Sequence, residues 1–260
     1  MPVNKDKGLF IVFFATAMCV VCSAAVSSLA VALREKQTTN KRLDKQKNIL
    51  RVAGLLEAGA SPDQAAVEEA FKNIEAYLID RKTGERVEGE VAGYDQRKAA
   101  KTDEGGVSAE SGVAKLAQVK RLPNTLLVYE VTVPGKEAYI LPISGNGLWS
   151  TLLGFIAVKL NAQTIAGITY YEHAETPGLG GEVDNPKWKA LWPGRQIYGP
   201  EGDVRINANK GGGFGPDHDI DALSGATITS HGVTYMLQLW LGPDGYQPFL
   251  KKATAGSGGN

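Results

Sequence analysis

The feature that most constrains this chain is an uncharged, apolar run near its N-terminus. Residues 8–33 carry no charged side chain and are rich in phenylalanine, valine, alanine, leucine and isoleucine. A membrane-spanning helix needs about 20 such residues, so the run is long enough to span a bilayer with some tilt. We therefore expect a transmembrane helix over residues 8–33.

A cleaved signal peptide is the alternative interpretation of the same run. Lys5 and Lys7 stand in front of it, and Ala30-Val31-Ala32 near its end resembles a cleavage site. The apolar core of a signal peptide usually has about 7–15 residues, fewer than here, and the helical pattern continues beyond the run. An uncleaved anchor is therefore favoured.

The charges that flank the run bear on its orientation. Lys5 and Lys7 precede it, whereas four basic residues follow it, namely Arg34, Lys36, Lys41 and Arg42. This bias alone would place the C-terminal side in the cytoplasm, although long domains translocate regardless of charge. The flanking charges and the length of the C-terminal domain thus leave both orientations of the helix open.

Cysteine and net charge exclude several classes of function. Cys19 and Cys22 form a Cys-x-x-Cys pair, but they lie inside the apolar run with no further ligands nearby, where cysteine is a small hydrophobic residue. The rest of the chain has no cysteine, so it can hold neither a disulfide nor a thiolate-bound iron–sulfur cluster. The 28 basic and 28 acidic residues balance, which gives no indication of nucleic-acid binding.

The remaining sequence predicts an α+β fold. We expect an N-terminal tail over 1–7, the transmembrane helix over 8–33, a charged stalk helix over 34–60 that ends at Ala58-Gly59-Ala60, and a soluble mixed α/β domain over 61–260. Ser61-Pro62 is a typical helix start, with Ser61 as the cap. Strand-like runs lie at 76–80, 126–133, 137–141, 152–158 and 164–171. Residues 95–121 are polar and predict an inserted surface segment with short helical pieces, and the chain beyond Phe249 predicts a flexible end.

One stretch, Asp221 to Ser230, combines an acid, hydroxyls and very small residues directly before a predicted helix. Val233, Met236, Leu237 and Trp240 recur downstream at helical spacing. Unpaired N–H groups and the helix dipole favour an anion at such a start, and Gly225 and Ala226 would let a phosphate approach the backbone. An ordinary helix cap is the simpler interpretation of the same residues.

Two glycine-containing loops are further candidates for a binding site. Gly145 and Gly147 surround Asn146 just before Trp149, which could stack on an aromatic cofactor or belong to the core. A second loop, residues 172–182, follows a predicted strand and is dense in Glu, Thr and Gly. His173 with Glu172, Glu175 and Glu182 could suggest a metal site, but the spacing is irregular and a Thr-Pro-Gly turn offering N–H groups to a flavin ring fits better.

Four features occur here in one order: an N-terminal anchor, the motif Ser144-Gly145-Asn146-Gly147-Leu148-Trp149, the motif Glu175-Thr176-Pro177-Gly178-Leu179-Gly180, and Asp221-x-x-Ser224-Gly225-Ala226-Thr227. Together they resemble the NqrC family of the sodium-translocating NADH:quinone oxidoreductase, which is related to a shorter flavoprotein of the Rnf complex. The resemblance extends over nearly the whole chain and is weakest at 95–121.

This resemblance implies a covalent flavoprotein. FMN would be esterified through its phosphate to Thr227 by a flavin transferase that takes it from FAD and reads Asp221. No catalytic residue and no metal ligand is implied. The implied flavin contacts are Asp221, Ser224, Gly225, Ala226, Thr229, Gly145, Gly147, Leu148, Trp149, Glu175, Thr176, Gly178, Leu179 and Gly180. Lys210, in the glycine-rich loop 210–215, is a further candidate that would neutralise the phosphate or the reduced flavin; an ordinary solvated lysine is the simpler interpretation.

The resemblance also implies a setting. The chain would be a single-span subunit of the bacterial inner membrane whose flavin domain faces the periplasm, against the charge bias. Together with the other subunits it would relay electrons from NADH to ubiquinone while sodium is exported. An Rnf-type relay between ferredoxin and NAD, or a membrane-anchored assembly subunit without redox function, is the alternative.

Overall fold

The computed structural model describes residues 5–57, 59–60, 62–211 and 213–257. Contacts divide the chain into two compact units, with the boundary between Asp44 and Lys45. The first unit is helical, and the second contains every strand that the structure describes. The boundary lies inside the stalk helix expected over 34–60.

Helix α1 (Lys5–Val52) contains the apolar run. Within the described residues it is the one helix long and apolar enough to cross a membrane, and none of its most apolar window is buried against protein. The helix ends at Val52, earlier than the predicted Ala58-Gly59-Ala60. Gly54 has φ +69°, the Gly54 N–H bonds the Arg51 carbonyl and the Leu55 N–H bonds the Leu50 carbonyl, as in a Schellman motif.

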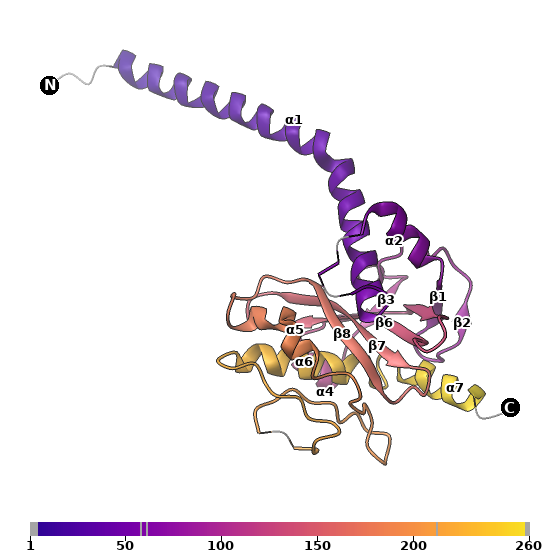
Figure 1. Cartoon of the computed structure of the whole chain (residues 1–260). Helices are drawn as coiled ribbons and strands as arrows, with labels where there is room; N and C mark the ends of the chain where they lie inside the picture. Colours follow the sequence, from indigo (N-terminus) through magenta and orange to yellow (C-terminus); the bar gives the residue numbers. More distant parts are fainter. Residues whose placement is uncertain (1–4, 58, 61, 212, 258–260) are drawn as a thin grey trace. The chain divides into compact units, whose positions relative to one another are not determined.

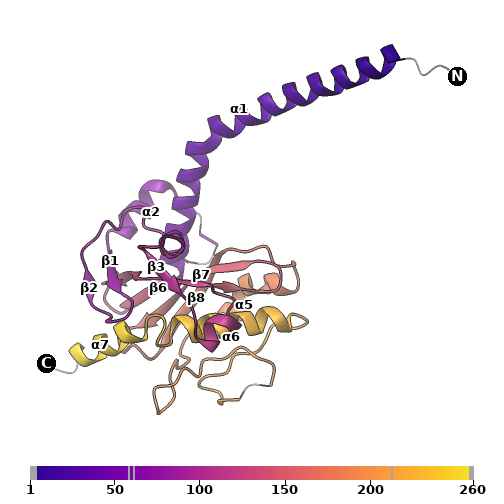
Figure 2. The same ribbon diagram turned by 180° about the vertical axis from the view of Figure 1, so that it is seen from behind.

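The second unit is built on a six-stranded antiparallel sheet in the order β2-β1-β5-β6-β7-β8 (Figures 1 and 2). The strands are β1 (Ile74–Asp80), β2 (Arg86–Val87), β5 (Thr125–Val131), β6 (Ala138–Asn146), β7 (Thr151–Lys159) and β8 (Ile165–Glu172). The predicted strands are therefore present within a few residues. Pro134-Gly135 lies in the turn that joins β5 to β6, and Gly135 there has φ +80°.

Both faces of the sheet are covered, which explains why its central strands are apolar almost throughout. One face packs with helix α6 (Thr227–Trp240) in the main core, to which alternate strand residues such as Val128, Leu141 and Ile156 belong. On the other face, the end of α1 lies on β8, where the Thr169 hydroxyl donates to Asn48. Helix α2 (Gln64–Phe71) lies on this face too, with Phe71 edge-on to Tyr129.

Helix α2 begins with a side-chain cap, as the sequence indicates, but from a different residue. The Asp63 carboxylate accepts the Ala66 N–H at 2.8 Å. Ser61, the predicted cap, lies outside the described residues. The sequence therefore indicated the start of this helix within two residues, but the side chain that caps it is Asp63.

The segment 95–121 is more than a surface insertion. It forms α3 (Gln96–Lys101), β3 (Gly106–Ser108) and α4 (Gly112–Leu116), and β3 pairs with β4 (Arg121–Pro123). Gln96 is buried between β5 and β6, where its Oε1 accepts the Leu127 N–H and its Nε2 donates to the Pro142 carbonyl, both at 3.2 Å. Pro142 has no N–H to donate, and the glutamine side chain replaces the ladder bonds there.

The C-terminal third completes the main core. It holds the short helices η1 (Gly180–Asp184) and α5 (Pro186–Lys189), then α6, and finally α7 (Gln247–Ser257) where we expected a flexible end. Phe249 of α7 packs edge-on against Tyr77 and Tyr139, with ring centroids 6.3 and 5.0 Å apart. This apolar contact explains why a helix forms again beyond Gly242-Pro243.

Candidate functional site

Two loops meet at one end of strands β6, β7 and β8, beside the start of α6. Strand β6 ends where β7 begins, with Asn146 opposite Thr151, and Leu153 of β7 lies opposite Glu172 at the end of β8. Helix α6 packs closely on β6: a Cβ on Gly145 would lie 2.7 Å from the Met236 side chain, and the Trp240 Nε1 donates to the Ser144 carbonyl. The loops 147–150 and 173–179 thus lie next to the first turn of α6.

Glu175 joins these segments. Its Oε1 accepts the N–H groups of Trp149 and Ser150 at 2.9 and 3.0 Å and the Ser150 hydroxyl at 3.1 Å. Its Oε2 accepts the Leu148 N–H at 3.1 Å and the Thr229 hydroxyl at 2.7 Å. We call Glu175 and these four donor residues the Glu175 cluster.

Glu175 is 5% exposed, so its ionisation depends on its partners. Burial alone would raise the pKa of the carboxyl, but the hydrogen bonds from Thr229, Trp149, Leu148 and Ser150 favour the charged form, and the net pKa lies below the usual value for glutamate. The cluster therefore holds a carboxylate at neutral pH.

The segment 221–226 forms a tight turn into α6. Gly225 has φ +71°, a conformation that side chains with a Cβ rarely adopt. The buried Ser230 hydroxyl accepts the Leu223 N–H at 2.9 Å and donates to the Ala226 carbonyl at 3.1 Å. The Trp188 indole donates to the Asp221 carbonyl at 2.8 Å. These bonds fix the turn without using its exposed side chains.

The structure distinguishes the hydroxyls of this segment. Thr229 is 1% exposed and committed to Glu175, and Ser230 is fully buried. Ser224 and Thr227 are exposed, and the Thr227 hydroxyl makes no hydrogen bond to any residue that the structure describes. Among the same residues no side chain caps the start of α6, where Ala226 is the cap residue. The interpretation as an ordinary side-chain cap is therefore wrong for this helix.

A cavity of about 640 Å³ lies beside Thr227. It brings together five of the predicted residues, Lys210, Asp221, Ser224, Gly225 and Thr227. One wall is the 209–219 loop, which the Asp219 carboxylate folds by accepting the N–H groups of Gly213, Phe214 and Gly215. The lining is polar and carries one cationic side chain, Lys210, together with the carboxylates of Asp219 and Asp221. An anionic group would therefore bind near Lys210 and the N–H groups at the start of α6.

Exposed apolar side chains lie on the loops that Glu175 joins and in the first turn of α6. Leu148 and Trp149 are 47% and 72% exposed, and Leu179 and Ile228 are 44% and 57% exposed. Leu179 Cδ2 would lie 3.0 Å from a Cβ on Gly225, so the loop 175–180 reaches the turn before Thr227. Trp149 is thus not a core residue, one of the two possibilities that its sequence left open.

Other predicted residues have roles inside the fold. Gly145 belongs to β6 beneath Met236, and Gly147 and Gly180 leave room for the Glu175 carboxylate, 2.7 and 2.6 Å from where a Cβ would stand. Thr176 and Gly178 are exposed in the turn before η1, and Ala226 is buried. Ser230 and Trp188 are site residues that the sequence analysis did not single out, and only the periodicity of α6 hinted that Ser230 faces inward.

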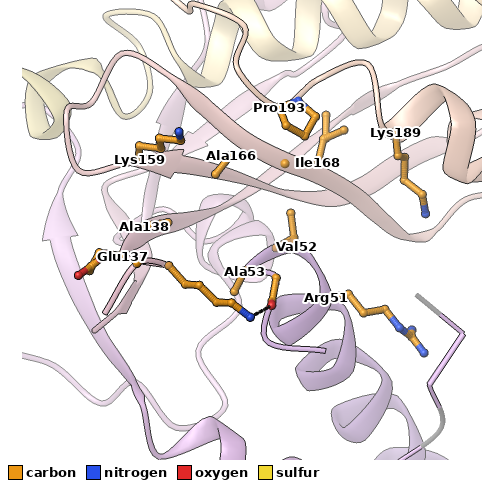
Figure 3. Close-up of a pocket in the computed structure, with 14 residues that line it drawn as sticks. Arg51, Val52, Ala53, Glu137, Ala138, Lys159, Ala166, Ile168, Lys189 and Pro193 are labelled. Atoms are coloured by element: carbon orange, nitrogen blue, oxygen red, sulfur yellow. Dashed lines mark hydrogen bonds between the residues drawn. The ribbon is translucent and has the colours of Figure 1, made fainter. Parts of the chain in front are cut away.

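A second hollow, of about 460 Å³, lies at the opposite end of the strands (Figure 3). Arg51, Lys136, Lys159 and Lys189 line it, and the Lys136 amine donates to the Gly54 carbonyl. It contains none of the predicted site residues. The candidate site is therefore the hollow at Thr227.

Comparison with known proteins identifies the family of this chain. Residues 147–242 match the FMN-binding domain family. The C subunit (NqrC) of the Na(+)-translocating NADH-quinone reductase from Vibrio anguillarum is 44% identical over 98% of this chain and 99% of its own length. The chain belongs to the NqrC family. The Pseudomonas aeruginosa NqrC is 42% identical over 97% of this chain and 98% of its own length.

Solved structures of the NqrC family share the fold. The crystal structure of Shewanella oneidensis NqrC is 32% identical and superimposes with a TM-score of 0.74, covering 84% of this chain and 99% of that one. The crystal structure of the Parabacteroides distasonis protein superimposes with a TM-score of 0.65 at 30% identity, over 84% and 96% of the two chains. The fold class expected from the sequence is confirmed.

Proposed function

We propose that this chain is the covalent-FMN electron-relay subunit of a Na⁺-translocating NADH:quinone reductase. The observation that carries the proposal is the state of Thr227: an exposed threonine at the uncapped start of α6, whose hydroxyl bonds no described residue, beside a cavity that also contains Lys210. The family assignment supports the flavin and the complex.

The residues present fit the phosphate of FMN. Among the described residues, no side chain caps the backbone N–H groups in the first turn of α6. These N–H groups and the positive end of the helix dipole would therefore attract an anion at this position. Gly225 and Ala226 leave the backbone accessible, and Ser224 adds an exposed hydroxyl. Lys210 supplies a positive charge from the other wall. Each of these groups stabilises a negatively charged phosphodiester.

The isoalloxazine ring fits the apolar surface next to this cavity. Leu148, Trp149 and Leu179 offer flat or branched apolar side chains, and an exposed indole stacks well on an aromatic ring. Thr176 and Gly178 lie in a turn whose N–H groups can bond the polar edge of the ring. The loops that carry this apolar surface are supported from inside the protein by Gly147, Gly180, Glu175 and Thr229.

Attachment is a phosphoryl transfer. The Thr227 hydroxyl oxygen forms a P–O bond to the FMN-side phosphorus of FAD, the phosphoanhydride bond breaks, AMP leaves, and the hydroxyl proton passes to the flavin transferase or to water. No electron is gained or lost. Asp221 is exposed beside the acceptor, where the transferase can read it.

Bound FMN supplies the electron chemistry, which the protein tunes through nearby dipoles and charges. In this proposal α1 crosses the bacterial inner membrane once over 8–33, and the domain over 61–260 lies in the periplasm. Electrons from NADH pass through this chain and the other subunits to ubiquinone as sodium is exported. The chain by itself turns over no substrate.

The test is co-expression of the full chain with its flavin transferase, followed by denaturing electrophoresis under ultraviolet light. A fluorescent band is expected for the wild type and for Ser108→Ala, which removes an exposed hydroxyl outside the proposed site, and no fluorescence for Thr227→Ala. A dark wild-type band would instead support an assembly subunit without a redox role. A fluorescent Thr227→Ala band would show that the flavin is attached elsewhere.

A further inference from the structure

We propose that Glu175 is a positioning residue, whose carboxylate fixes the 147–150 loop and the first turn of α6 in the arrangement that receives the flavin, and which holds a negative charge beside it. The expected effect of this charge on the reduction potential of the flavin rests on the proposed function. Its structural part, the fixing of the loop and the turn, concerns this chain alone.

The contacts require a group that only accepts hydrogen bonds. All five bonds to the Glu175 oxygens come from donors, three of them backbone N–H groups of Leu148, Trp149 and Ser150. The two hydroxyl donors are Ser150 and Thr229. A neutral amide in the same place would turn its own N–H groups toward some of these donors. The cluster is therefore specific for a carboxylate.

The surroundings are shaped to this carboxylate. Gly147 and Gly180 pass so close to it that a Cβ on either would lie 2.7 or 2.6 Å from a carboxylate oxygen or carbon. The backbone of Glu175 is also held, because its N–H donates to His173 Nδ1 at 3.3 Å while His173 Nε2 bonds Asp184 at 2.8 Å. Glu175 thus has little freedom to move away from its donors.

The segments that Glu175 joins carry the exposed apolar side chains proposed to contact the flavin ring. Leu148 and Trp149 project into solvent, so packing of their side chains cannot hold the loop in place. Thr229 lies two residues after Thr227, so its bond to Glu175 fixes the turn that bears the attachment hydroxyl. A fixed anion next to a flavin disfavours its reduction, since reduction adds negative charge.

The first test needs no flavin. Amide hydrogen exchange is measured on Glu175→Gln and on Glu172→Gln, a matched control that removes an exposed carboxylate three residues earlier. Exchange at Leu148, Trp149 and Ser150 should be roughly tenfold or more faster in Glu175→Gln, and unchanged in Glu172→Gln. Equal protection in both variants would overturn the positioning role, whether or not the chain binds flavin.

The second test uses the flavin-loaded full chain. Glu175→Gln should show a more positive FMN midpoint potential and a changed visible circular dichroism, whereas Glu172→Gln keeps both at wild-type values. If Glu175→Gln does not fold, Thr229→Val is used instead. This variant keeps the Glu175 carboxylate, so the FMN midpoint potential should stay at the wild-type value. It loses the bond from Thr229 to Glu175, so the visible circular dichroism should change. A loaded variant with wild-type potential and dichroism contradicts the inference. A wild type without flavin contradicts the proposed function and leaves the exchange result to decide on Glu175.

Discussion

The Ser230 hydroxyl accepts the backbone N–H of Leu223 across the turn that leads into α6. It also donates to the Ala226 carbonyl, so one fully buried side chain ties both ends of the turn together. Thr227 follows directly, and its position depends on this closure. The attachment residue is thus held by a neighbour that does not itself reach the cavity.

Ser230→Ala should lower the free energy of unfolding by about 1–3 kcal/mol, because the buried Leu223 N–H loses its acceptor. Chemical denaturation of the variant measures this change. Ser224→Ala, an exposed serine in the same turn, should stay within about 0.5 kcal/mol of the wild type. Equal stability of the two variants would argue against the buried bond.

Gly232→Ala should destabilise the domain. A Cβ there would overlap the Asn146 carbonyl oxygen, where α6 packs on the end of β6. Relieving the overlap requires a backbone shift that costs about 1–3 kcal/mol. Gly112→Ala is the control: it is also a helical glycine, but its Cβ meets nothing within 4 Å, and the change should stabilise α4 by about 0.5–1 kcal/mol. Thermal melting compares the two, and a shift in the same direction contradicts the packing argument.

Gln96→Leu should cost about 1–3 kcal/mol, because the Leu127 N–H is then buried without a partner. The Tyr246 hydroxyl keeps its bonds to the Leu127 and Pro142 carbonyls, which limits the loss. Gln64→Leu changes an exposed helical glutamine instead and should be nearly neutral. Urea denaturation at neutral pH measures the difference between the two variants.

The stability difference between the wild type and Glu175→Gln should depend on pH. Because the folded-state pKa of Glu175 lies below its usual value, its contribution is complete above the ordinary glutamate pKa of about 4.3 and is lost as the pH falls through the folded value. Denaturant titrations from neutral to strongly acidic pH should therefore show the two curves converging in acid. A difference that grows on acidification would contradict the depressed pKa.

Local patterns were sufficient to predict most of the fold. The apolar run, the strands and the start of α6 were each indicated by the spacing of apolar residues. Because side chains alternate between the two faces of a strand, the sequence also indicates which strand residues face the same side of the sheet. The predicted end of α1 at Ala58-Gly59-Ala60 was wrong because an earlier glycine, Gly54, already ends the helix. The Schellman bonds form there. Helix α7 was missed because its apolar contact is with distant strands.

The candidate site was predicted only in outline. Motif residues indicated the right loops, but the bonds that organise them join residues far apart in sequence: Thr229 to Glu175, and Trp188 to Asp221. Helical spacing from Val233 places Thr229 on the buried face of α6 and Thr227 away from it, but it cannot reveal that the Thr229 hydroxyl bonds Glu175. Likewise, Gln96 completes a ladder at Pro142, a role that a polar segment does not suggest.

The central claim is that FMN is joined to the hydroxyl of Thr227. The most direct measurement is fragmentation mass spectrometry of the peptide that spans 221–230, taken from the full chain co-expressed with the flavin transferase. The account predicts an FMN mass on Thr227, with Ser224, Thr229 and Ser230 unmodified. An unmodified peptide, or a flavin on any other hydroxyl, would contradict it.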